Sequence, residues 1–156
     1  MISVDIAGHR FQLRAAAVVA HDGFVLLHRM EGDEYWSLPG GRVEPGEDAR
    51  STLEREMVEE LNELVECTEL LYVVENFFEH AGKPNHEIGL YFRVDLGPTS
   101  KLLDKSRSHA GVEGGKQLEF RWFLAEQLHE VDVRPSFLRG ALSQPILCFQ
   151  HIVQRG

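Results

Sequence analysis

Residues 41–63, GRVEPGEDARSTLEREMVEELNE, specify one helix and the chemistry that the helix carries. Asp48 has a side chain that caps helix N-termini. Asn62 tolerates the left-handed backbone with which many helices end, second only to glycine. These two signals predict a helix over residues 49–61.

Three glutamates fall on one side of this predicted helix: Glu56, Glu59 and Glu60. Successive helical residues advance by about 100°, so positions i, i+3 and i+4 share roughly a quarter turn. An adjoining stripe is apolar and would pack the helix on a core: Leu53, Met57 and Leu61. Like charges at this spacing destabilise a helix by about 0.2–0.5 kcal/mol per pair, which favours a compensating cation. Because carboxylate oxygens suit Mg²⁺ or Mn²⁺, the stretch predicts a metal site.

The same stretch resembles the Nudix box, G-x5-E-x7-R-E-U-x-E-E-x-G-U, in which U is a bulky aliphatic residue. The positions that match in register are Gly41, Glu47, Arg55, Glu56, Met57, Glu59 and Glu60. Asn62 replaces the last glycine and Glu63 the last aliphatic residue, and neither change touches the expected metal ligands. Residues 36–41 and 119–122 also look like neighbouring features of the family, so the resemblance covers roughly residues 13–128. The chain is therefore similar to the Nudix hydrolases, the MutT-like pyrophosphohydrolases.

The resemblance implies a fold and an activity. The expected fold is α+β, an α/β/α sandwich around a mixed β-sheet, formed by one Nudix domain over residues 1–156. The expected activity is metal-dependent cleavage of the diphosphate linkage in a nucleoside diphosphate linked to a group X, such as a nucleotide-sugar or ADP-ribose. One alternative is a nucleoside triphosphate pyrophosphatase that removes modified nucleotides. Another is a non-catalytic Nudix-fold sensor, although such modules usually lose box carboxylates that this chain keeps.

The resemblance also assigns roles to individual residues of the box. The expected ligands of Mg²⁺ or Mn²⁺ are Glu56, Glu59 and Glu60, together with the backbone carbonyl of Gly40. Glycine suits that position because a carbonyl can approach a metal closely where no Cβ obstructs it. Arg55 lies four residues before Glu59, so we expect it to orient carboxylates rather than to bind the metal.

The general base is left open between two glutamates. Glu59 is the first choice, because its neighbours could hold the metal while it contacts the attacking water. Glu113, which stands among glycines, is the choice if the base arrives on a mobile loop. For the substrate, Arg42 is the expected phosphate contact and Trp36 the expected aromatic contact to the base. Weaker candidates for substrate contacts or a second metal are Arg14, Arg29, Glu75 and Glu87.

Composition is that of an ordinary globular protein, with 43% hydrophobic and 26% charged residues among 156. A formal net charge of −9 argues against a nucleic-acid partner but permits a small nucleotide held through a metal. No stretch reads as a signal peptide or a membrane span, so we expect no membrane partner and a cytoplasmic location. Cys67 and Cys148 share no redox or metal-ligand spacing and are expected to be reduced thiols. The oligomeric state stays open, with a homodimer suggested only by analogy.

Outside the helix, the sequence predicts strands followed by helical turns. Alternating or apolar runs predict strands over residues 2–6, 11–20, 24–28, 70–78, 87–94 and 118–123. The glycine-containing segment 97–117 is expected to be mainly a mobile loop. Helical turns are expected over residues 125–128, 136–142 and 146–153. Strands on both sides of one central helix, with more helix at the end, also favour a sandwich around a mixed sheet.

Overall fold

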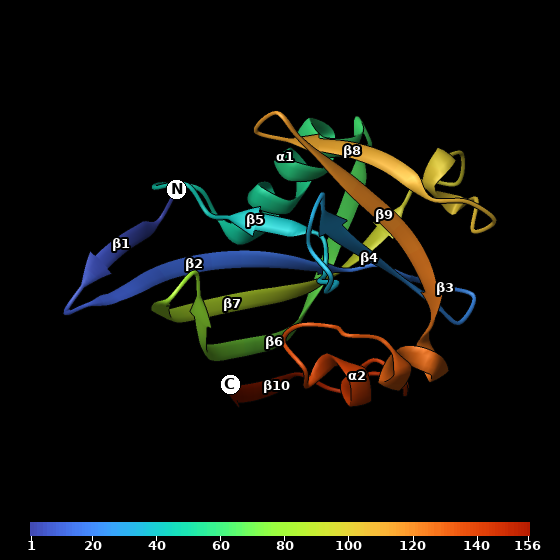
Figure 1. Ribbon diagram of the computed structural model, residues 1–156. Coiled ribbons are helices and arrows are strands. Elements are labelled where there is room, and N and C mark those ends of the chain that lie inside the picture. Colours follow the sequence, from blue (N-terminus) through green and yellow to red (C-terminus); the bar gives the residue numbers. More distant parts are fainter.

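Two β-sheets and one long helix make up the fold, which a computed structural model describes for residues 1–156 (Figure 1). The larger sheet is mixed and its strands, in spatial order, are β1 (Ser3–Ile6), β2 (His9–Val18), β7 (Lys83–Leu96), β6 (Val65–His80) and β10 (Gln150–Arg155), with β5 (Gly40–Arg42) also paired to β2. The smaller sheet is antiparallel and contains β3 (Ala20–His21), β4 (Phe24–Met30), β9 (Lys116–Leu124) and β8 (His109–Glu113). The α-helices are α1 (Ala49–Leu61) and the short α2 (Leu138–Ala141), with 3-10 turns at Lys101–Leu103 and Ala125–Glu130. None of these helices has both the length and the apolar character needed to cross a membrane.

Strand β2 shows how the layers form, because its side chains alternate between the two faces of the larger sheet. Ala15 belongs to a core cluster that also contains Leu53 of α1. Its neighbour Ala16 belongs to a second cluster, which contains Leu138 of α2. Helices therefore cover both faces of a mixed sheet, and the expected α+β fold class is confirmed.

The helix predicted over residues 49–61 is confirmed at both ends. The Asp48 side chain accepts a hydrogen bond of 2.9 Å from the backbone N–H of Ser51, which caps the first turn. Asn62 adopts a φ of 54°, in the left-handed region, and its backbone N–H donates to the Val58 carbonyl at 2.9 Å. The helix boundaries thus follow from local interactions that the sequence already displays.

The hairpin of β6 and β7 is longer than the sequence indicates. The predicted strands over residues 70–78 and 87–94 leave residues 79–86 as a connection, but only Ala81 and Gly82 separate β6 from β7. Both turn residues have positive φ, 51° and 76°, which is the backbone of a two-residue hairpin turn. Pro84 lies within β7, and because proline is rare inside strands, residue propensity does not predict a strand there.

Two expectations for the C-terminal half are wrong. Residues 97–117 are not one mobile loop, because they contain a 3-10 turn and β8, and Gly114 and Gly115 connect β8 to its partner β9. Residues 146–153 are not helical, because β10 forms there and pairs in parallel with β6. Both strands depend on partners elsewhere in the fold, and tertiary pairing overrides weak local propensity. The expected helical turns over residues 125–128 and 136–142 contain helix at Ala125–Glu130 and Leu138–Ala141.

The two cysteines differ in their surroundings, and we expect them to differ in reactivity. Cys67 is buried in the core cluster under α1, and burial raises the pKa of its thiol to about 11. Cys148 is exposed. Because the thiolate is the reactive form, an aromatic disulfide reagent at pH 8 should modify one thiol per folded chain quickly and the second only in denaturant. Rapid modification of two thiols in the native protein, followed by absorbance, would contradict this assignment.

Candidate metal centre and active site

Glu60 is buried at the C-terminal end of α1 without a partner for its charge. The residue is 5% exposed, and neither of its carboxylate oxygens has a hydrogen-bond partner. The carboxyl group of Glu56, one helical turn earlier, lies within hydrogen-bonding reach. Burial, and after it the charge of Glu56, raises the pKa of Glu60 far above its ordinary value. A buried pair of carboxyl groups of this kind must share a proton or bind a cation.

A glycine pair brings backbone against these carboxyl groups. A Cβ on Gly41 would lie 2.5 Å from Cδ and 2.6 Å from Oε1 of Glu56, so only glycine lets this carboxyl group occupy its place. A Cβ on Gly40 would lie 2.1 Å from the backbone oxygen of Ala15, and Gly40 has a φ of 154°. The Gly40 carbonyl belongs to the peptide unit that leads into Gly41. It is therefore one bond from the residue whose Cα lies against the Glu56 carboxyl group.

This donor set fits a divalent metal ion, with one correction to the sequence-based expectation. The unpartnered Glu60 carboxyl group, the neighbouring Glu56 carboxyl group and a nearby carbonyl are hard oxygen ligands, the kind that Mg²⁺ and Mn²⁺ prefer. However, no group of three or more Asp, Glu, His or Cys side chains converges closely enough to hold an ion. The side chain of Glu59 is 58% exposed and is bound to Arg55 instead. The expected three-carboxylate set is therefore a pair, Glu56 and Glu60, with Glu59 at its edge.

Arg55 ties the carboxylates around the site together. Its guanidinium donates two hydrogen bonds to Glu47, of 2.8 and 3.0 Å, in a bidentate pair. It also donates to Glu56 at 2.9 Å and to Glu59 at 3.1 Å. The bond to Arg55 lowers the pKa of Glu47 to about 2, so Glu47 is ionised at neutral pH. Arg55 thus holds Glu47, Glu56 and Glu59 in fixed positions. The helical spacing predicts only the contact with Glu59.

Two arginines lie opposite each other where β2 pairs with β5. Arg14 and Arg42 are direct partners in this antiparallel ladder, so their side chains leave the same face of the sheet. Arg14 donates to the Leu38 carbonyl at 3.0 Å, and its positive charge acts on the Glu60 carboxyl group. Arg42 donates to the Met1 sulfur. Positive charge therefore lies beside the carboxyl pair, where a phosphate chain would need it.

The structure brings Glu113 to the site by a different route from the one expected. Glu113 ends β8 and is exposed, and it lies in a tight hairpin rather than on a mobile loop. Gly111 of the same strand packs so closely on α1 that a Cβ there would lie 2.9 Å from the Glu60 backbone oxygen. The charge of Glu113 contributes to the raised pKa of Glu60. The hairpin therefore positions Glu113 near the carboxyl pair.

Trp36 lies in the core, which corrects its expected role as an aromatic contact. Its side chain is 5% exposed and packs edge-on against Phe123. The guanidinium groups of Arg29 and Arg121 lie 4.4 and 5.0 Å from the ring centroid. A buried ring covered by two cations leaves no face for a base to stack on. The substrate must therefore be recognised by other residues.

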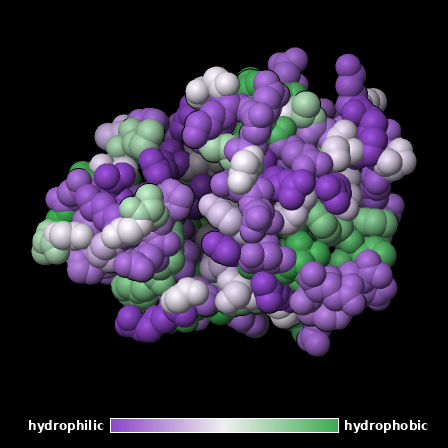
Figure 2. All heavy atoms as spheres, viewed as in Figure 1, coloured by the Kyte–Doolittle hydropathy of each residue, from purple (hydrophilic) through white to green (hydrophobic).

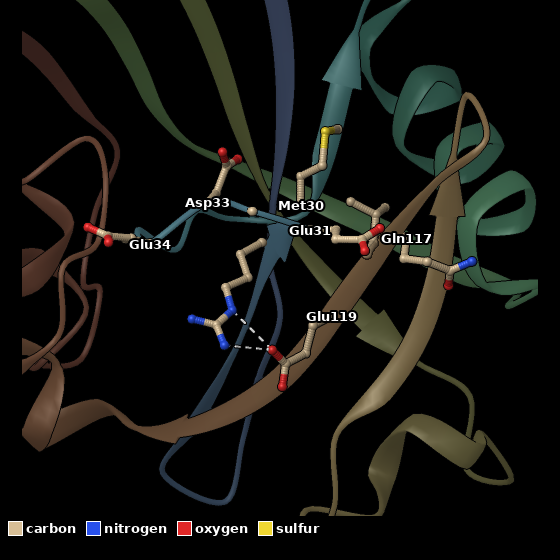
Figure 3. A pocket seen from close by; sticks show the side chains of 9 residues that line it. Met30, Glu31, Asp33, Glu34, Gln117 and Glu119 are labelled. Carbon is tan, nitrogen blue, oxygen red and sulfur yellow. Dashed lines mark hydrogen bonds and ion pairs between the residues drawn. The ribbon is translucent and has the colours of Figure 1, made fainter.

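An acidic groove of about 550 Å³ lies between the segment after β4 and the start of β9 (Figure 3). Its acidic residues are Glu31, Asp33, Glu34 and Glu119. Arg29 is its one basic residue and pairs with Glu119 at 3.0 Å. This excess of negative charge disfavours a free polyphosphate, so we do not place the phosphates of a substrate there.

The larger sheet carries a buried polar pair that no sequence pattern connects. Nε2 of Gln12, on β2, donates to Oε2 of Glu87, on β7, at 2.6 Å. Gln12 and Glu87 are 75 residues apart, so no local pattern could join them. Both are buried, as is Asn76, which faces Glu87 from β6. Only the parallel register of β2 with β7 creates this cluster.

Comparisons with known proteins give a consistent result. The family model for the NUDIX domain matches residues 10–140. The nucleoside triphosphatase NudI of Escherichia coli O1:K1 / APEC is 41% identical over 58 residues, which is 34% of this chain and 41% of that protein. The match thus spans about two fifths of the length of the curated relative.

Solved structures share the fold at low sequence identity. A NUDIX hydrolase from Nitrosomonas europaea has a TM-score of 0.63 and 22% identity, with 93% of this chain and 79% of that chain covered. A UDP-X diphosphatase has a TM-score of 0.62 and 19% identity, with 90% and 66% covered. At these identities the likeness shows the fold alone.

Proposed function

The chain belongs to the Nudix family, and from this premise we propose that it is a divalent-metal-dependent pyrophosphohydrolase. Its proposed substrate is a nucleoside diphosphate linked to a group X, and the bond broken is the diphosphate linkage. The observation that carries the proposal is the buried Glu60 carboxyl group, unpartnered beside Glu56 and the Gly40–Gly41 backbone. A folded protein keeps such a group when a bound cation compensates it.

The roles that we propose follow from these positions. Glu56, Glu60 and the Gly40 carbonyl hold the ion, with Glu59 at the edge of the set. A bound divalent ion supplies charge neutralisation of the diphosphate and a water of lowered pKa. Arg55 is a positioning residue, because it fixes Glu56 and Glu59 by hydrogen bonds. Arg14, whose charge acts on Glu60, and its strand partner Arg42 would contact the phosphate oxygens.

A nucleoside triphosphate pyrophosphatase is the second candidate. The observation that favours it is the 41% identical segment shared with a nucleoside triphosphatase. The likeness to a UDP-X diphosphatase extends over more of the chain but at 19% identity. Both activities use the same carboxyl pair, so the identity of the substrate rests on residues outside the box.

A substrate panel with product identification tests the proposal. The purified chain is incubated with nucleotide-sugars, ADP-ribose, nucleoside triphosphates and oxidised nucleotides, with Mg²⁺ or Mn²⁺ or with EDTA. We expect hydrolysis with either metal and none with EDTA, and the products distinguish a monophosphate plus X-phosphate from a monophosphate plus pyrophosphate. Absence of any product across the panel would leave nucleotide binding without hydrolysis as the better account.

Two glutamate variants address the proton acceptor. Glu59→Gln should lower kcat by about 10²-fold or more, because a general base contributes about that much and Glu59 shares the helix with the carboxyl pair. Glu113→Gln should lower kcat by about tenfold or less, since Glu113 is exposed at the end of β8. Rates are compared at saturating substrate across pH. If kcat fell more in Glu113→Gln than in Glu59→Gln, Glu113 of the hairpin would be the proton acceptor instead.

A further inference from the structure

A row of polar side chains crosses the larger sheet beside the proposed reaction centre. Glu87 is the register partner of Gln12 on one side and of Asn76 on the other, so the three side chains share one face. They are 5%, 6% and 7% exposed, respectively. Polar residues in the middle of a sheet that otherwise packs a core are expected to be fully hydrogen-bonded. This row is not.

The hydrogen bonds of the row leave acceptors without donors. The Gln12 amide nitrogen donates to Oε2 of Glu87 at 2.6 Å, so a carboxylate fixes which end of the amide faces it. Oε1 of Gln12 must then point the other way, and it is buried with no partner. The second oxygen of Glu87 also receives no hydrogen bond within the chain. Two acceptor oxygens, on side chains that are register partners, thus lack donors within the chain, and Asn76 adds an amide on the other side of Glu87.

The row continues toward the arginines of the site. Two residues along the same face, Arg14 pairs with Gly89, where the absence of a side chain leaves space for the ring of Tyr91. A Cβ on Gly89 would lie 2.5 Å from that ring. The charges of Glu87 and Arg14 both act on the Tyr91 hydroxyl, whose pKa burial raises. Arg14 is thus two residues from the polar row on the same face, and its charge also acts on Glu60 of the carboxyl pair.

The surface is hollowed in this part of the molecule. In Figure 2 a hollow flanked by hydrophilic residues separates the surface over β1 from the surface over β4 and β9. Strands β2 and β7 pass between those two parts in the same view (Figure 1). A ligand with its phosphates at Arg14 could extend its other half along the polar row.

We propose that Gln12, Glu87 and Asn76 form the specificity site for the nucleoside half of the substrate, which they recognise through two adjacent hydrogen-bond donors. Two groups of a nucleoside present such a pair: the vicinal hydroxyls of ribose, and the imino and amino groups on the edge of guanine. Both would satisfy the open oxygens of Gln12 and Glu87. The inference rests on the proposed function, which supplies the nucleotide character of the substrate.

Binding of free nucleosides tests the inference without any phosphate chemistry. The nitrogen-15-labelled chain in EDTA is titrated with guanosine, 2′,3′-dideoxyguanosine, adenosine and 2′,3′-dideoxyadenosine, and shifts of backbone amides give Kd. Guanosine carries both donor pairs and 2′,3′-dideoxyguanosine carries the guanine edge alone. Adenosine carries the diol alone, and 2′,3′-dideoxyadenosine carries neither pair. We expect 2′,3′-dideoxyadenosine to bind at least tenfold more weakly than guanosine. Tight binding of adenosine then identifies the diol, and tight binding of 2′,3′-dideoxyguanosine identifies the guanine edge.

Variants on the two faces of the same sheet provide the control. Glu87→Gln should raise Kd for the preferred nucleoside about tenfold or more, since a hydrogen bond to a charged group contributes on that scale. Glu79→Gln should leave Kd unchanged, because Glu79 is exposed, pairs with Pro84 and faces the opposite side of the sheet from Asn76. Circular dichroism checks that both variants fold.

Several outcomes would overturn the inference. These are equal binding of all four nucleosides to the wild type, no binding of any of them, amide shifts centred away from residues 12, 76 and 87, and equal Kd in folded Glu87→Gln. The wild-type comparison decides the question even if Glu87→Gln does not fold. Because nucleosides lack phosphate, selective binding by a chain that hydrolyses nothing would refute the proposed hydrolysis alone. Hydrolysis without selective nucleoside binding would refute the specificity site alone.

Discussion

Glu60→Gln should nearly abolish turnover and at the same time stabilise the metal-free protein. Removing one group that stabilises charge in a transition state lowers kcat by about 10²–10³-fold, and loss of the ion lowers it further. The stability of the metal-free variant should increase, because the wild-type carboxyl group is buried without a hydrogen-bond partner. A glutamine there carries no charge and can donate to Glu56. We expect the free energy of unfolding to rise by about 1–3 kcal/mol, a few degrees in Tm for a chain of this size.

The measurement combines kcat with thermal unfolding in EDTA and in Mg²⁺. Mg²⁺ should raise the Tm of the wild type, because an ion that binds only the folded state stabilises it, and should raise that of Glu60→Gln much less. Glu54→Gln is the matched control, since Glu54 is exposed on the same helix. A Glu60→Gln variant with wild-type turnover, or one that loses stability in EDTA, would remove Glu60 from the metal centre.

Gly41→Ala should lower activity strongly while leaving the fold intact. The new Cβ would lie 2.5 Å from Cδ of Glu56, so this carboxyl group must swing away from Glu60. The end of a glutamate side chain moves easily, so Tm should change little. Because the donor pair is then broken, we expect kcat to fall by about 10²-fold or more. Steady-state kinetics and the Mg²⁺-dependent rise in Tm measure both effects.

Two neighbouring substitutions separate the site from the backbone. In Gly40→Ala the Cβ would lie 2.1 Å from the Ala15 backbone oxygen, and the φ of 154° disfavours any side chain. This variant should therefore unfold at a much lower temperature than Gly41→Ala. Gly97→Ala is the neutral control, since its Cβ would meet nothing within 4 Å. If Gly40→Ala and Gly41→Ala lost stability equally, the distinction between the two glycines would fail.

The helix and the residues on it could be read from the sequence because they depend on local interactions. The Asp48 cap, the left-handed Asn62 and the spacing of Glu56 and Glu60 all act within a few residues along the chain. Such interactions form whatever the rest of the fold does. The sequence therefore determined the exact bounds of α1, and the match to the box determined the family.

The tertiary structure decided everything that requires distant segments to meet. Only strand pairing places Glu113 beside Glu60 and connects Gln12 to Glu87, and only packing buries Trp36. The strands β8 and β10 likewise exist through their partners rather than through their own propensity. Burial also decided the state of Glu60, because a glutamate on a helix is ordinary until the surrounding fold removes its water and supplies no partner.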